Sequence, residues 1–262
     1  MKSSASNQVN NFKKKGIIEF NNIFQKEKCI NLYNQLTKDR EWGPSLFRSQ
    51  KDVILNPQYK KTNPGKGINN LAEKFNLDFI EKNEIIINTL NFILGIDFEI
   101  ILKKFVVAAP SHWIPNWLKG KIAASLAANL GPYIKEEFRD VTYFRGIDYH
   151  MDQIDFPNSN PDFITMYVYL NDTTPEMSPL HVIEKSHIYG PTKFPHFINE
   201  VNEDYVIYGL DKNNSKKLKK KMLMGNAGTA YIWSCLTLHG TQPQVDKDIF
   251  RISLRYLIKK NK

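Results

Sequence analysis

Apolar positions in the first third of the chain recur with the spacing of helices. The apolar residues of the segment 25–38 stand at helical spacing among polar ones: Cys29, Ile30, Leu32, Tyr33 and Leu36. This pattern predicts an amphipathic helix, and a similar pattern over 77–94 predicts a second helix that ends at Gly95. Residues 41–69 are rich in Pro, Gly, Asn and Lys, which indicates irregular structure. Residues 1–15 are polar, and we expect a flexible N-terminal tail there.

After Gly95 the pattern changes to short runs of β-branched and aromatic residues, typical of strands. The runs cover residues 98–107, 138–149, 163–170, 229–235 and 250–258. Clusters of turn-forming residues separate them, as at 156–161 and 225–228. We therefore predict a mainly β fold with flanking helices, built on a double-stranded β-helix of the jelly-roll or cupin-like kind. Its single domain is expected to cover residues 16–262.

One lysine-rich interruption, residues 194–221, falls between the predicted strands. It is interpreted as either a surface helical insertion or a mobile flap. Long connections in compact domains are often functional, so one hypothesis makes this segment a lid over the substrate opening. The alternative is a surface insertion far from any site.

Composition narrows the class of protein. With 262 residues, 42% apolar and 24% charged, the chain is expected to be globular. It has no run of about 20 apolar residues and no apolar stretch near its start, so neither a membrane span nor a secretory signal is predicted. Cys29 and Cys235 are far apart in sequence, and we expect two buried thiols in a cytoplasmic protein. The oligomeric state is not indicated.

The chain carries a formal charge of +9, from 36 Lys and Arg against 27 Asp and Glu. Part of the excess lies in three lysine runs, at 13–15, 216–221 and 259–262. Such runs are usually solvated surface, and the alternative is attraction to an anionic partner or substrate. No nucleic-acid motif accompanies them, so a nucleic-acid partner is not expected.

Three residues form a candidate metal site. His150 and Asp152 are two apart on a predicted strand, so their side chains project to the same side. His239 follows the predicted strand 229–235. Two imidazoles and one carboxylate are the ligand set of non-haem Fe(II) oxygenases, which leaves three coordination positions open. The alternative is that Asp152 accepts a hydrogen bond from His150 and that His239 is an ordinary buried histidine.

A second feature of the candidate site is an arginine downstream of His239. Arg251 begins the β-rich run 251–258, and arginine can hold a carboxylate through two parallel hydrogen bonds. The distal carboxylate of a 2-oxoglutarate co-substrate needs such a cation. Arg255 is a competitor, since residues 251, 253 and 255 share one face of a regular strand. Arg251 could also form a structural ion pair.

Taken together, these stretches resemble the phytanoyl-CoA dioxygenase family of Fe(II)- and 2-oxoglutarate-dependent oxygenases. The resemblance covers residues from about 16 to 258. The segments that carry it are 150–152, 178–187, 225–233, 238–241 and Arg251.

The resemblance implies His150, Asp152 and His239 as iron ligands and as the catalytic centre. It implies Arg251 as the clamp for 2-oxoglutarate, and Thr241 in the place of a hydroxyl residue that often assists this clamp. Fe(II), 2-oxoglutarate and O2 are the expected cofactors. Related halogenases have a small residue in place of the carboxylate, so Asp152 implies hydroxylation or another oxidation of a C–H bond.

The expected substrate is a small metabolite, and the basic surface would suit an anionic one. Two other functions stay open at this point. One is a non-catalytic jelly-roll binding protein, and the other is an oxygenase that modifies a macromolecule.

Overall fold

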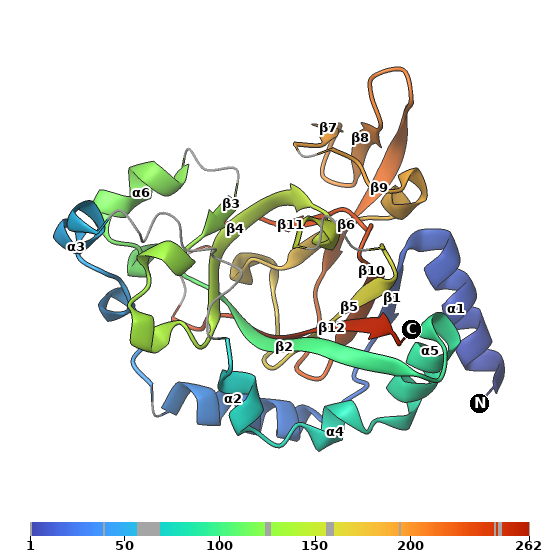
Figure 1. Cartoon of the computed structure of the whole chain (residues 1–262), viewed down its shortest axis with the longest axis horizontal. Helices are drawn as coiled ribbons and strands as arrows, with labels where there is room; N and C mark the ends of the chain where they lie inside the picture. The colour runs from blue at the N-terminus through green and yellow to red at the C-terminus, as the bar shows by residue number, and fades with distance from the viewer. Residues whose placement is uncertain are drawn as a thin grey trace.

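Twelve strands of the described chain join in one curved sheet, and helices cover one of its faces (Figure 1). This computed structural model describes residues 2–38, 40–56, 69–123, 127–155, 160–193, 195–243, 245 and 248–261. The strands are β1 (Ile17–Phe20), β2 (Phe98–Ala108), β3 (Ala127–Asn129), β4 (Thr142–His150), β5 (Phe163–Tyr169), β6 (Leu180–Ile183), β7 (Phe197–Glu200), β8 (Tyr205–Gly209), β9 (Ser215–Leu223), β10 (Ala230–Ser234), β11 (His239–Thr241) and β12 (Ile252–Lys260). The helices are α1 (Lys2–Lys15), α2 (Lys26–Lys38), α3 (Gln50–Leu55), α4 (Asp78–Glu81), α5 (Glu84–Leu94) and α6 (Asn116–Ala123).

The strand order is β1-β10-β5-β12-β2-β4-β11-β6-β9-β8-β7, and β3 pairs with β4 beside this path. The pairings are antiparallel except for that of β2 with β4. Side chains from strands far apart in this order nevertheless pack together in one cluster: Ile17, Val106, Tyr167, Tyr169, Leu180, Val182, Leu223, Tyr231 and Trp233. The sheet therefore curls until β6 and β9 face β5 and β10, and these side chains fill its inside. The predicted fold class is confirmed.

The outer face of the curled sheet carries the larger core. Met166 and Val168 of β5 and Leu254 of β12 alternate with inward-facing residues and pack against helices α2, α4 and α5. In Figure 1 these helices lie along one side of the sheet. Every residue of β5 is buried, because this strand is covered on both faces.

The predicted helix over 25–38 and the five predicted strand runs are present, with shifted ends. The predicted helix over 77–94 is divided into α4 and α5. The division occurs at Asn83, whose side chain accepts hydrogen bonds from the backbone of Ile85 and Ile86 and so caps α5. Gly95 follows α5 with a positive φ of 97°. None of the described helices is long and apolar enough to cross a membrane.

The N-terminal segment forms helix α1 over Lys2–Lys15, which the sequence pattern did not predict, while the flexibility expected of residues 1–15 stays a prediction. Val9 is buried and Phe12 packs against the main core. The carbonyl of Lys15 also accepts a hydrogen bond from the backbone of Lys185. These two apolar side chains and this hydrogen bond attach the polar helix to the domain. The extent of the single domain stays a prediction.

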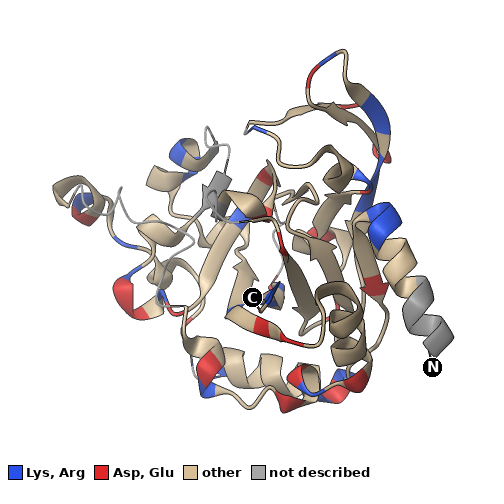
Figure 2. Ribbon diagram, turned by 45° about the vertical axis from the view of Figure 1, so that its right-hand side comes forward, with Lys and Arg blue, Asp and Glu red and all other residues tan. Residues whose placement is uncertain are grey.

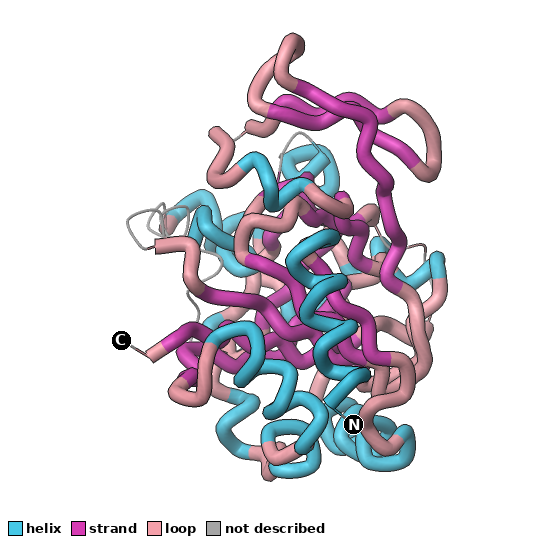
Figure 3. Tube along the Cα trace, turned by 90° about the vertical axis from the view of Figure 1, so that its right-hand side faces the viewer, coloured by secondary structure: helices cyan, strands magenta, loops and turns pink. Residues whose placement is uncertain are grey.

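The lysine-rich interruption is not helical. Phe194 lies outside the described residues, and the rest of the segment forms an arm of β7, β8 and the start of β9 that projects from the barrel (Figure 3). On its inner face Leu218 on β9 pairs with Val206 on β8, while Lys217 and Lys219 point to the other face. Lys216 and Lys220 stand on the same face as Leu218, so lysine on both faces hides the period of two. Figure 2 shows Lys and Arg, in blue, along β9 and at the end of α1 on the same side of the molecule.

Candidate metal centre

Strand pairing brings the two histidines of the predicted site together. His150 is the last residue of β4 and His239 the first of β11, and the antiparallel ladder sets them directly opposite each other. Their ring centroids are 4.4 Å apart. Asp152 begins the turn after β4. One ligand atom from each of the three side chains lies within 4.8 Å of the other two, so the structure assembles the predicted trio.

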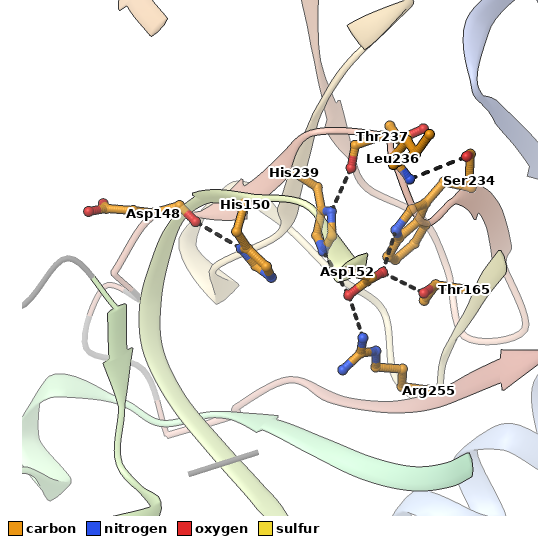
Figure 4. Close-up of polar contacts among 10 residues, drawn as sticks. Asp148, His150, Asp152, Thr165, Ser234, Leu236, Thr237, His239 and Arg255 are labelled. Atoms are coloured by element: carbon orange, nitrogen blue, oxygen red, sulfur yellow. Dashed lines mark hydrogen bonds and ion pairs between the residues drawn. The ribbon is translucent and has the colours of Figure 1, made fainter. Parts of the chain in front are cut away.

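Backbone carbonyls orient both imidazoles (Figure 4). Nδ1 of His150 is 2.9 Å from the carbonyl oxygen of Asp148, and Nδ1 of His239 is 2.9 Å from that of Thr237. A carbonyl oxygen can only accept, so each Nδ1 must carry the hydrogen. Each Nε2 is then left with a free lone pair, which is the form of histidine that binds a metal ion.

Burial keeps these imidazoles neutral. Removal from water lowers the pKa of His150 to about 4, and the nearby His239 adds to this shift. Burial also lowers the pKa of His239, although Asp152 acts in the opposite direction. Both rings are therefore neutral near pH 7, with the hydrogen on Nδ1 and the lone pair on Nε2, as metal ligation requires.

Asp152 is almost completely buried, and it is ionised. Burial alone would raise the pKa of its carboxyl, but Arg255 and the other polar neighbours hold that pKa well below its usual range. Oδ1 lies 3.6 Å from Nε2 of His239 and accepts a hydrogen bond from Arg255. Oδ2 accepts hydrogen bonds from Thr165 and from the indole of Trp233. In the described chain, no hydrogen bond joins Asp152 to His150.

The two arginines have different surroundings. Arg251, just before β12, donates hydrogen bonds to the carbonyl of Ser178 at 3.1 Å and to the hydroxyl of Ser253 at 2.7 Å. It is buried, and none of the residues that the structure describes supplies it with a carboxylate. Arg255, four residues further along the chain, is bonded to Asp152 instead. The shared face expected of residues 251, 253 and 255 is thus present.

A narrow pocket with about 30 Å³ of free space opens at the trio. It is lined by Phe144, Ile147, His150, Asp152, Tyr167, Leu180, Trp233, His239, Gly240, Thr241 and Arg255. The hydroxyl of Thr241 is buried and has no hydrogen-bonding partner in the described part of the chain. Arg251 does not line this pocket. Its guanidinium carbon lies 5.9 Å from the ring centroid of Tyr167 and 5.9 Å from that of Tyr169.

The fold has counterparts among solved structures. The chain is similar to the non-heme alpha-ketoglutarate-dependent epimerase SnoN from nogalamycin biosynthesis, with a TM-score of 0.57 and 11% identity. The match covers 99% of this chain and 82% of that one. A second structure, SnoN in complex with Fe3+, alpha-ketoglutarate and nogalamycin RO, matches with a TM-score of 0.56 and 10% identity. That match covers 99% of this chain and 85% of the other.

No family model matches the sequence, and no curated protein matches it significantly. At 10–11% identity the similarity to SnoN shows a common fold. Membership of the phytanoyl-CoA dioxygenase family therefore stays a prediction.

Two residues at the site were missed by sequence reasoning. Thr165 and Trp233 bond Asp152, and they occupy opposite positions on β5 and β10. Thr165 could have been noticed as the one residue with an aliphatic hydroxyl in the otherwise apolar and aromatic run 163–170. His187, by contrast, bonds the carbonyl of Lys13 and holds α1, which is a structural role.

Proposed function

We propose that this protein is an Fe(II)- and 2-oxoglutarate-dependent oxygenase that oxidises a C–H bond of a small molecule. The observation that carries the proposal is the geometry of the trio. Two imidazoles with free Nε2 lone pairs and one ionised carboxylate meet inside a jelly-roll barrel. Iron with 2-oxoglutarate would supply the activation of O2 at this place.

The donor set fits iron. Two neutral nitrogens and one carboxylate oxygen, presented from one side, suit Fe(II) with positions left open for a chelating co-substrate. The unpartnered hydroxyl of Thr241 offers a hydrogen bond to an anionic group in the same pocket. In this proposal His150, Asp152 and His239 hold the metal.

Arg251, assisted by Thr241, is proposed to hold the distal carboxylate of 2-oxoglutarate. A buried guanidinium without a carboxylate among its described partners supports this choice. Arg255 is the weaker choice for the clamp, because its guanidinium is already bonded to Asp152. The aromatic and aliphatic side chains of the pocket would exclude water from the reacting groups.

The reaction type follows from the carboxylate. Asp152 occupies the coordination position that a halide would need, so hydroxylation or a related oxidation is the proposed outcome. SnoN is a non-heme alpha-ketoglutarate-dependent epimerase, so inversion at a C–H carbon, which is no net oxidation of the substrate, is a second candidate outcome. The substrate class and the family membership rest on the sequence motifs.

The test begins with metal binding. Anaerobic addition of Fe(II) and 2-oxoglutarate should produce the visible charge-transfer band of the chelate, and succinate should form in air. His150→Ala should lose both signals, whereas His112→Ala, at an exposed histidine away from the site, should keep them. Failure of the unaltered protein to bind Fe(II) would overturn the proposal.

A further inference from the structure

The two oxygens of Asp152 have different neighbours. Oδ2 accepts one hydrogen bond from the hydroxyl of Thr165 and one from Nε1 of Trp233, at 3.1 Å for the indole. Oδ1 faces Nε2 of His239 and accepts from Arg255. The carboxylate is thereby fixed in rotation, with one edge toward the histidines and the other toward β5 and β10.

Each carboxylate oxygen has two lone-pair directions. On Oδ2 both are used, one by Thr165 and one by Trp233. On Oδ1 one is used by Arg255, so a second direction is left toward the two histidines. Asp152 can therefore offer a metal ion only Oδ1.

We propose that Thr165 and Trp233 are positioning residues that restrict Asp152 to coordination through one oxygen. This inference rests on the proposed function, in which the trio binds a metal ion. Its consequence lies in the number of open positions. Three single-atom protein ligands leave three places on an octahedral ion, whereas a carboxylate bound through both oxygens leaves two. A two-atom chelator and a third ligand need all three.

The framework around the two donors is rigid. Thr165 and Trp233 are direct partners in the antiparallel ladder between β5 and β10, and both are fully buried. The indole stacks on Tyr167, with ring centroids 5.5 Å apart, and it also contacts the ring of His239 at 5.1 Å. Trp233 thus touches two members of the trio, and neither donor can turn away without breaking the packing inside the barrel.

Three substitutions separate positioning from mere stabilisation. Thr165→Val removes the hydroxyl and keeps the shape, Thr165→Ser keeps the hydroxyl, and Trp233→Phe removes the indole N–H. Each variant would be titrated with Co(II) alone, whose visible spectrum reports coordination number. Thermal melting of the metal-free proteins would be measured in parallel.

The unaltered protein and Thr165→Ser should bind Co(II) with the same spectrum. Thr165→Val and Trp233→Phe should bind it about 10- to 100-fold more weakly, as loss of outer contacts to a ligand usually causes, and with an altered spectrum. If both variants melt at a lower temperature but keep the Co(II) spectrum and affinity of the unaltered protein, this inference is overturned and the proposed function is not. Absence of Co(II) binding in the unaltered protein would instead overturn the proposed function. Since Trp233→Phe and Thr165→Val alter different strands, folding failure in one leaves the other as the test.

Discussion

At the scale of single residues, hydrogen bonds decide what each polar group in the barrel can do. The carbonyls of Asp148 and Thr237 set the tautomers of His150 and His239. None of this is visible in the sequence, because it depends on where a backbone carbonyl points after folding. That these three residues come together could be predicted from the motif, but which of their atoms are free to bind a metal could not.

The roles of the two arginines can be separated by substitution. Arg251→Ala should raise the apparent KM for 2-oxoglutarate about 10- to 100-fold, the equivalent of one or two charge-assisted hydrogen bonds. Arg251→Lys should recover only part of this loss, since lysine cannot make two parallel bonds. The measurement is succinate release against 2-oxoglutarate concentration.

Arg255→Ala is the matched comparison. Its bond to Asp152 predicts weaker metal binding, with less effect on the requirement for 2-oxoglutarate. An unchanged KM for 2-oxoglutarate in Arg251→Ala together with a large increase in Arg255→Ala would move the clamp to Arg255.

The cysteines should be unreactive in the folded protein. Cys29 and Cys235 are both fully buried free thiols, as the sequence predicted. Burial disfavours the thiolate and raises the pKa of each to about 12, so at pH 8 almost none of the reactive form exists. Iodoacetamide at pH 8 should therefore label neither residue, as measured by mass spectrometry. In denaturant both should be labelled, and rapid labelling of either in the native protein would contradict the burial.

At the scale of elements, the sequence pattern predicted the strands that are buried on both faces. The strands β5, β10 and β12 are rich in β-branched and aromatic residues because both of their faces are covered. The arm of β7 to β9 was missed as a sheet, since lysine occupies positions on both faces of β9 and Leu218 is the one apolar residue in 215–221. Its inner face packs through Val206, Tyr208 and Leu218 against Met151 and Leu238, which are sequence neighbours of the trio. The role of the arm as a lid stays a prediction.

Helix α1 provides a test of the element that the sequence did not predict. Phe12→Ala should lower the free energy of unfolding by about 1–2 kcal/mol, because the ring packs against the main core. Asn11→Ala, at the neighbouring exposed position, should change it by less than about 0.5 kcal/mol. Urea denaturation measures both values. If both substitutions change the free energy of unfolding equally and negligibly, helix α1 is not packed on the core, and the flexible tail expected from the sequence is favoured.

At the scale of the whole molecule, the site depends on contacts between segments distant in sequence. His150 and His239 meet only because β11 pairs with β4, and Asp152 is fixed by β5, β10 and β12 together. The strand β11 has three residues and no apolar run, so its pairing could not be predicted from periodicity. Ion pairs account for part of the lysine runs, because Lys15, Lys220 and Lys221 each pair with a glutamate.

Because the trio joins distant segments, ligation should stabilise the entire fold. An ion that binds only the native state adds about 2.7 kcal/mol at a concentration 100 times its Kd. For a chain of this size that corresponds to a rise in Tm of about 5–10 °C. Differential scanning fluorimetry with Mn(II) and 2-oxoglutarate should show this rise in the unaltered protein, and His239→Ala should lose it, while its Tm without metal reports any separate cost of the substitution. An equal rise in both proteins would mean that the ion binds elsewhere, and that β4 and β11 are not joined by a metal.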